Sequence, residues 1–172
     1  MESKNFIQDY FLGIQYGDFD DRIKASSQYD SNYSVKGCKL NKTMENGHSS
    51  AWCAASSDKN AWIEVNLGGS YLITGVSIQG RGDSNQYVTK FRVLYSNDGI
   101  NFLNISEFRG NNNNTTVEKR QFPIPIYAKF IRIQILEYYA HPSLRFDLHY
   151  IPDNIPEIIK NKILSKKFIF YS

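Results

Sequence analysis

Hydrophobic and polar residues alternate along several short stretches of this chain. Isoleucine, valine or leucine occupies every second position over 63–67, 76–78 and 131–135, and aromatic residues join the pattern over 91–95 and 144–150. Successive side chains of an extended strand point to opposite faces, so a period of two predicts strands with one buried face. Repeated short strands without a long helical period indicate an all-β fold, either a sandwich or a barrel.

Turn-forming residues separate these stretches. Asp-Gly at 98–99 readily adopts the backbone dihedrals of a tight turn. The asparagine-rich segment 111–116 suits a turn better than a strand, and we expect a mobile loop of neutral filler there. We expect an N-terminal extension over 1–11, one domain over 12–151, and a C-terminal tail over 152–172.

The composition is that of a globular chain with a mild charge. A length of 172 residues suits one domain, and twelve tyrosines and eleven phenylalanines favour strands over helices. The net charge of +3, without a basic run interleaved with stacking aromatics in the domain, argues against nucleic acid as a partner. No export signal or membrane-spanning window is visible, so we expect a cytoplasmic or non-classically secreted protein.

The tail is both basic and hydrophobic. It mixes isoleucines and lysines over 155–167 and ends in Phe-Ile-Phe-Tyr at 168–171. Such a segment is suited to docking on a protein partner or to lying on an anionic membrane surface. The alternative is that it folds back on its own barrel, and the sequence leaves these readings open.

The two cysteines, Cys38 and Cys53, are not spaced as metal ligands are. A Cys38–Cys53 bridge requires an oxidising compartment, whereas free Cys is among the most buried residue types. We therefore favour two free buried thiols over a disulfide.

Several short words of sequence occur in a characteristic order. Residues 21–29 read Asp-Arg-Ile-Lys-Ala-Ser-Ser-Gln-Tyr, 62–68 read Trp-Ile-Glu-Val-Asn-Leu-Gly, 79–83 read Gln-Gly-Arg-Gly-Asp, and 143–150 read Ser-Leu-Arg-Phe-Asp-Leu-His-Tyr. In this order they resemble the discoidin domain family, the C-type module of coagulation factors V and VIII. Residues 79–83 are especially similar to the slime-mould discoidin lectins. The resemblance extends over 12–150.

The resemblance implies an eight-stranded antiparallel jelly-roll β-sandwich or barrel of the galactose-binding type, whose loops at one end bind ligand. Ligands of the family include galactose-type sugars, anionic phospholipid headgroups and extracellular proteins. Sugar-binding modules of this fold use an acidic loop to hold calcium, and the matching region here contains Glu45. Glu45 together with Asp147 is therefore the candidate for a residual calcium site.

A sugar site at the end of a barrel needs a planar charged group for paired hydroxyls and an aromatic face for the apolar side of the ring. The expected loops contain both kinds of residue. The candidates for ligand binding are His48, Trp52, Arg81, Asp83, Tyr138 and His141. The alternative for Arg81 is a structural ion pair with Asp83 or Glu137.

Other candidates also have structural alternatives. Trp52 lies in an Ala-Trp-Cys word entering a strand, which more often fills the core. His141 precedes Pro142 and shapes a turn in the alternative reading. Arg145 lies on the last strand, and we expect it to form a buried charge pair with Asp21 that holds the two sheets together.

No motif of metal-ligand spacing, nucleophile elbow or phosphate-binding glycine loop is present, so we do not expect an enzyme. The first hypothesis is a lectin-like recognition module that binds a carbohydrate or a similar polar ligand through its barrel-end loops. The second is an intracellular scaffold or structural subunit that contacts other proteins through its barrel and tail. Glycans or other proteins are therefore the expected partners.

Overall fold

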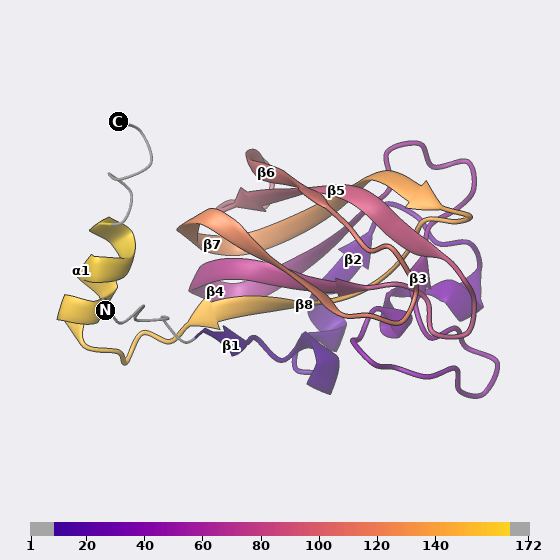
Figure 1. The fold of residues 1–172 in the computed structure, drawn as a ribbon, viewed down its shortest axis with the longest axis horizontal. Helices are drawn as coiled ribbons and strands as arrows, with labels where there is room; N and C mark the ends of the chain where they lie inside the picture. The colour runs from indigo at the N-terminus through magenta and orange to yellow at the C-terminus, as the bar shows by residue number, and fades with distance from the viewer. Residues whose placement is uncertain (1–8, 166–172) are drawn as a thin grey trace.

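The computed structural model describes residues 9–165, whose strands form a barrel-like arrangement (Figure 1). The strands are β1 (Tyr10–Phe11), β2 (Ile23–Ala25), β3 (Trp52–Cys53), β4 (Trp62–Gln79), β5 (Tyr87–Ser96), β6 (Leu103–Arg109), β7 (Glu118–Tyr139) and β8 (Ser143–Ile151). The helical elements are four short 3-10 helices (Ile14–Tyr16, Asp20–Arg22, Ser31–Tyr33 and Val35–Gly37) and the helix α1 (Glu157–Ser165). The named strands pair antiparallel, which confirms the all-β antiparallel fold with eight strands.

The strands follow the order β1-β8-β4-β7-β5-β6, with β2 on β4 and β3 on β8. The alternating stretches 63–67 and 76–78 belong to one long strand, β4, where separate strands were predicted. Register shifts between Asn66 and Tyr71 and between Ile73 and Gly75 let β4 bend while it stays paired with β7. A bulge of this kind changes strand direction without a turn, which explains why the sequence pattern looked interrupted.

The alternating hydrophobic residues fill the barrel as predicted. Ile63, Val65 and Ile133 have no exposed surface, and Phe91 and Phe146 are buried with them. Period-two patterning puts these side chains on the same face of β4, β5, β7 and β8, and truncating one of them to alanine typically costs about 2 to 5 kcal/mol. The core therefore supplies a rigid wall from which the connecting loops project.

The segment before the predicted domain start contributes to the sheet. Tyr10 pairs with Tyr150 and Phe11 with His149, so the sheet begins before Leu12. Phe11 also lies on the His149 ring, with ring centroids 4.6 Å apart. The N-terminal strand is thus part of the folded body.

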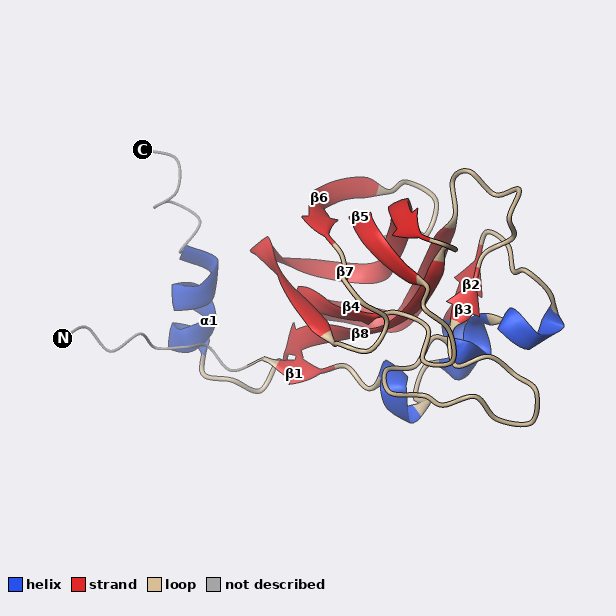
Figure 2. Ribbon diagram, turned by 45° about the vertical axis from the view of Figure 1, so that its right-hand side comes forward, coloured by secondary structure: helices blue, strands red, loops and turns tan. Residues whose placement is uncertain are grey.

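Part of the tail forms α1, a helix that was not predicted. Pro156 stands directly before it and accepts the first helical hydrogen bonds, from the N–H groups of Ile159 and Lys160. Ile155 and Leu164 pack on Leu72 and Ile151. Figure 2 shows α1 at one end of the barrel and the long loops with the short helices at the other. Residues 168–171 lie outside the described residues.

No helix within residues 9–165 has both the length and the apolar character that a bilayer span requires. Cys38 and Cys53 are free and buried, which confirms the prediction of two thiols. Burial raises the pKa of the Cys38 thiol to about 12 and also raises the pKa of Cys53. Neither thiol is therefore activated as a nucleophile.

Candidate functional site

Arg145 holds three loops together at the end of the barrel opposite α1. Its guanidinium donates to the carbonyl oxygens of Gly80 at 2.6 Å, Lys42 at 2.8 Å and Asn114 at 3.2 Å. The predicted pair with Asp21 is wrong, because Asp21 is exposed and backbone oxygens take the donors of Arg145. Desolvation lowers the pKa of Arg145 to about 10. Arg145 is still protonated near pH 7, and the three carbonyl oxygens replace the water that would otherwise solvate its charge.

The asparagine-rich loop is part of this framework. The side-chain amide of Asn114 donates to the carbonyl of Arg81 at 3.0 Å, and that of Asn111 donates to the carbonyl of Thr116 at 2.9 Å. Asn111 is only 4% exposed. The prediction of neutral filler at 111–116 is therefore wrong, since amide side chains here replace missing backbone partners.

Close approach of the loops explains the glycine at position 80. A Cβ added there would lie 2.7 Å from the Cα of Asn114, the carbonyl oxygen of Gln86 and the Cβ of Tyr87. Two of these atoms are backbone and cannot move aside cheaply. Gly80 thus allows the loop of residues 80–86 to cross the asparagine-rich loop.

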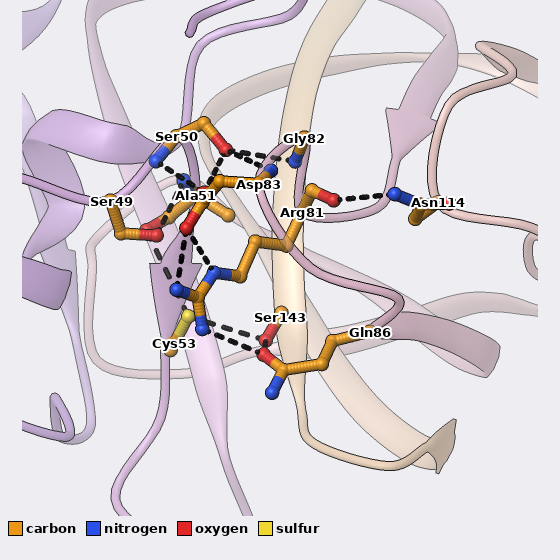
Figure 3. A network of polar contacts seen from close by, with 10 residues as sticks. All are labelled: Ser49, Ser50, Ala51, Cys53, Arg81, Gly82, Asp83, Gln86, Asn114 and Ser143. Carbon is orange, nitrogen blue, oxygen red and sulfur yellow. Dashed lines mark hydrogen bonds and ion pairs between the residues drawn. The ribbon is translucent and has the colours of Figure 1, made fainter. Parts of the chain in front are cut away.

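Arg81 and Asp83 form an ion pair inside the loop of residues 80–86 (Figure 3). Both the Nε and the Nη2 of Arg81 donate to Asp83 Oδ2, at 2.9 and 2.5 Å. Burial opposes ionisation of Asp83, but the bonds from Arg81 and Ser50 outweigh it and hold the pKa of that carboxyl well below its usual range. The structural alternative for Arg81 was an ion pair with Asp83 or Glu137, and the structure shows the pair with Asp83.

Ser50 joins this loop to the loop of residues 41–50. Its Oγ accepts from the N–H groups of Gly82 at 2.8 Å and Asp83 at 3.1 Å, and it donates to Asp83 Oδ1. Its own N–H also donates to Asp83 Oδ1, at 3.1 Å. Ser50 is fully buried, and no motif marked it as a site residue.

A cavity of about 370 Å³ opens beside the Arg81–Asp83 pair. We call it the recognition cavity. It is lined by Tyr29, Tyr33, Cys53, Ser56, Arg81, Gln86 and His141. The polar and aromatic side chains of four separate chain segments therefore meet in one place.

Tyr29 and Tyr33 form the aromatic wall of the recognition cavity, and edge-on ring contacts connect Tyr29 to Tyr33 and to His141. Tyr29 lies edge-on to Tyr33 at 5.3 Å and to His141 at 5.5 Å between ring centroids. The guanidinium of Arg81 lies 4.9 Å from the Tyr33 ring centroid, within the range of a cation–π contact. Sequence reasoning missed Tyr29 and Tyr33 as site residues. The available signal was that two aromatic residues spaced four apart follow Ser-Ser-Gln.

Two predicted site residues, Arg81 and His141, line the recognition cavity, and Asp83 holds Arg81 in place. Asp83 also borders a neighbouring hollow of about 290 Å³. Tyr138 is 48% exposed on β7 but does not line the recognition cavity.

Trp52 does not face a ligand, so that prediction is wrong and its structural alternative holds. The side chain has no exposed surface, and its indole N–H donates to the carbonyl of Ser27 at 2.8 Å. A bulky ring at the start of a strand that enters the barrel gains more from burial than from exposure.

His48 is exposed in a tight turn with Glu45, outside the recognition cavity. The two residues exchange backbone hydrogen bonds at 3.1 and 2.8 Å. Asn46 and Gly47 between them have φ values of 51° and 78°, as a two-residue hairpin turn requires. The structure thus places His48 at a loop tip.

The residual calcium site predicted from Glu45 and Asp147 is wrong. Asp147 is fully buried, and its oxygens accept N–H groups of residues 13, 14, 15 and 148 at 3.3, 3.2, 3.1 and 2.7 Å. Burial raises the pKa of Asp147, partly offset by these bonds. Among residues 9–165 no group of three or more His, Cys, Asp or Glu is arranged to hold a metal ion. These residues do not fit calcium, which needs several free hard oxygens.

Solved structures share this fold. Discoidin II of Dictyostelium discoideum superimposes with a TM-score of 0.75 at 25% identity, over 84% of this chain and 60% of that chain. A carbohydrate-binding module of Clostridium perfringens, solved with GalNAc-β-1,3-galactose, superimposes with a TM-score of 0.61 at 21% identity, over 74% of this chain and 93% of that chain. Lectins and carbohydrate-binding modules are therefore structural relatives, and the jelly-roll-like fold is confirmed.

Sequence comparison agrees with the fold. Neuropilin-1 of Rattus norvegicus is 34% identical over 149 residues, which is 80% of this chain but only 16% of that protein. The chain thus spans about one sixth of this relative. The profile of the F5/8 type C domain matches residues 22–148. These matches, together with the shared fold, show that the chain belongs to the F5/8 type C domain family, also known as the discoidin family.

Proposed function

We propose that this chain is a non-enzymatic recognition module that binds a carbohydrate in the recognition cavity. The observation that carries the proposal is the meeting of an aromatic wall, formed by Tyr29 and Tyr33, with the fixed guanidinium of Arg81 in a cavity of about 370 Å³. This volume is within the range of small-molecule sites.

The chemistry of the recognition cavity suits a sugar ring. Sugars present an apolar face of C–H groups, which packs on aromatic side chains, and a rim of hydroxyl groups, which need donors and acceptors. Tyr29 is 56% exposed, so its ring is available to such a face. Cavity walls that are already braced by hydrogen bonds lose little entropy when a ligand binds.

The comparisons support the same ligand class. The Clostridium perfringens module was solved with a galactose-containing disaccharide, and domains of this family are typically non-catalytic. We therefore expect a glycan as the ligand of this chain and recognition without turnover.

A glycan array with wild-type protein and the Arg81→Ala variant tests the proposal. We expect wild-type binding to one class of glycan and a loss of about tenfold or more in the variant, because Asp83, Gln86 and Tyr33 lose their common contact. Arg109→Ala is the matched control, since Arg109 is an exposed arginine outside the recognition cavity. Absence of binding by the wild type, or equal binding by Arg81→Ala, would contradict the proposal.

A second function, protein docking as a scaffold subunit, is favoured by the exposed isoleucines of α1. Ile158 is 68% exposed and Ile159 is 41% exposed, although α1 is packed on the barrel through Leu164. The double variant Ile158→Glu, Ile159→Glu changes two exposed residues and keeps Leu164, which packs on Leu72 and Ile151. Co-purification of native partners with the wild type but not with this variant is the expected result, and equal co-purification would reject this function.

A further inference from the structure

Two polar side chains of the recognition cavity have their hydrogen-bonding roles set by their neighbours. They are Gln86, which precedes β5, and His141, which precedes β8. Because an amide and an imidazole each carry both a donor and an acceptor, the neighbours decide which atom is left for a ligand. The inference below rests on the proposed function and assigns roles within the same cavity.

The amide of Gln86 is oriented by two donors. Its Oε1 accepts from the Nη1 of Arg81 at 3.1 Å and from the Oγ of Ser143 at 3.0 Å. A guanidinium can only donate, so the atom that faces Arg81 must be the oxygen. Figure 3 shows the side-chain nitrogen of Gln86 directed away from Arg81 and Ser143. The NH₂ group is therefore the part of Gln86 left to donate to a ligand.

The imidazole of His141 is oriented by one acceptor. Its Nε2 lies 2.8 Å from the carbonyl oxygen of Ala54, and a carbonyl can only accept, so Nε2 carries the proton. The same loop is held from the other side, because the N–H of Ala54 donates to the carbonyl of Pro142 at 3.0 Å. In the neutral ring Nδ1 is then an acceptor, and no described residue donates to it.

Arg81 is already committed to protein partners. Its Nε and Nη2 donate to Asp83, its Nη1 donates to Gln86, and the charge of Asp83 balances its own. Its side chain is only 14% exposed. An arginine bound in this way orients its neighbours more than it attracts a charged ligand.

We propose that Gln86 and His141 form the donor and acceptor pair that reads the hydroxyl groups of a sugar, and that Arg81 is the positioning residue for Gln86. A hydroxyl group donates and accepts, so one hydroxyl satisfies His141 Nδ1 while a neighbouring oxygen accepts from Gln86 Nε2. Tyr29 and Tyr33 then supply the face on which the ring lies. Specificity follows because a ligand that covers Gln86 Nε2 and His141 Nδ1 without hydrogen-bonding to them would leave both atoms unpaired.

Nitrogen NMR of the free protein tests the assignment without any ligand. We expect the ¹⁵N shifts of His141 to show a protonated Nε2 and an unprotonated Nδ1 at pH values where the ring is neutral. Hydrogen–deuterium exchange of the Gln86 NH₂ group should be fast, because Gln86 lines the recognition cavity and no described residue accepts a hydrogen bond from this group. A proton on Nδ1, or a protected Gln86 NH₂ group, would overturn the proposal.

Gln86→Glu is the sharpest binding variant. A glutamate keeps oxygen acceptors for Arg81 and Ser143 but replaces the NH₂ donor with an oxygen, so the fold is retained while the donor is lost. We expect about tenfold weaker binding of GalNAc-β-1,3-galactose, or of the glycan that the array selects, measured by NMR titration. The control is Gln28→Glu, which makes the same change at an exposed residue beside Tyr29.

His141 is tested by a pair of variants. His141→Phe keeps a ring for the contact with Tyr29 but has no acceptor, and we expect about tenfold weaker binding. His141→Asn restores an oxygen close to the position of Nδ1 and should recover part of the loss. Equal binding by wild type and His141→Phe would overturn the role of His141.

The role of Arg81 is tested by a double-mutant cycle. Arg81→Met weakens binding in the wild type but adds little in a Gln86→Leu background if Arg81 acts through Gln86. Additive losses would instead assign Arg81 a direct ligand contact and overturn its positioning role. If the wild type binds no glycan, the proposed function fails; if it binds and the Gln86 and His141 variants bind equally well, only this inference fails.

Discussion

Two regions of β8 each contain a buried charged side chain that forms no ion pair with a described residue, and the two side chains bind different backbone groups. Arg145 is 3% exposed, and its guanidinium donates to carbonyl oxygens of three loops at the end of the barrel that holds the recognition cavity. Asp147 is fully buried and gathers backbone N–H groups, mostly from the chain segment that follows β1. Residues two apart on a strand share a face, so both charges lie on the face turned away from the barrel core.

Arg145, Asp147 and His149 form one row of buried polar residues on β8, and members of this row fix different parts of the chain. Arg145 satisfies backbone carbonyls of three loops, and one of these loops contributes Arg81 and Gln86 to the recognition cavity. Asp147 accepts from the N–H groups of residues 13–15 and so fastens the N-terminal segment to the sheet. His149, next in the same row, is 5% exposed, accepts or donates a hydrogen bond of 2.7 Å with Ser77, and is covered by Phe11. Arg145 thus fixes the loops around the recognition cavity, and Asp147 attaches the N-terminal segment to β8.

The largest expected effect is that of Arg145→Ala. The substitution leaves the carbonyl oxygens of Gly80, Lys42 and Asn114 without their donor, and we expect a loss of about 3 kcal/mol in the free energy of unfolding. Glycan binding should fall with it because the three loops separate. Urea unfolding and the glycan titration measure the two effects. Arg109→Ala, an exposed change, should cost under about 0.5 kcal/mol, and comparable losses in both variants would contradict the loop-holding role.

Asp147→Asn should cost about 2 kcal/mol, because the amide NH₂ faces backbone N–H groups that need an acceptor. Since these bonds lie away from the recognition cavity, the dissociation constant of the glycan should stay within about twofold of wild type at a temperature where the variant is folded. A large loss of affinity would show that the two regions of β8 are energetically coupled, and the contrast between them would fail.

The smallest expected effect is a pH dependence from His149. Desolvation first, and then the nearby Lys119, lower its pKa from 6.5 to about 4, while Asp9 acts in the opposite direction. The unfolded chain therefore binds the proton before the folded one does, so stability falls as the pH drops from about 6.5 towards 4, by roughly 1 to 2 kcal/mol between pH 7 and pH 5.

Urea unfolding at several pH values measures this slope. Other groups around His149 are Asp9, whose pKa is lowered, and the hydroxyls of Ser77 and Thr74. The pKa of Asp147 is raised, so its contribution to stability falls as the pH rises above 3.8, opposite in sign to that of His149. The pH profile of the wild type is therefore compared with that of His149→Gln, which removes only the contribution of His149. An identical pH profile in that variant would reject the assignment.

Much of the fold could be predicted from the alternation of hydrophobic and polar residues. The stretches 63–67 and 131–135 became buried faces of β4 and β7, and the order of the family words identified the domain. The bulged continuity of β4 was missed because a register shift looks like a strand end when only period two is considered. The helix α1 was missed because a helix of nine residues is too short to be stable by itself, and its packing on Leu72 is a tertiary contact.

The residues of the recognition cavity could be predicted only in part from the sequence. Arg81 and His141 were predicted from their chemistry and loop positions, and both line it. Tyr29 and Tyr33 were missed because they come from a segment about fifty residues before Arg81, and only folding brings the segments together. Trp52 was misassigned because an aromatic residue near a loop has the same composition signal whether it faces a sugar or the core.

The sequence by itself determined the alternating pattern, hence the β-barrel and its buried face, and it carried the family words that place the chain among discoidin domains. Only the tertiary structure decided which polar groups form hydrogen bonds within the protein and which do not. Hydrophobic burial is a property of each side chain and its period, whereas the availability of a donor or acceptor depends on which distant backbone atoms reach it first. Gln86 and His141 gained their roles in this way, through Arg81 and the carbonyl of Ala54.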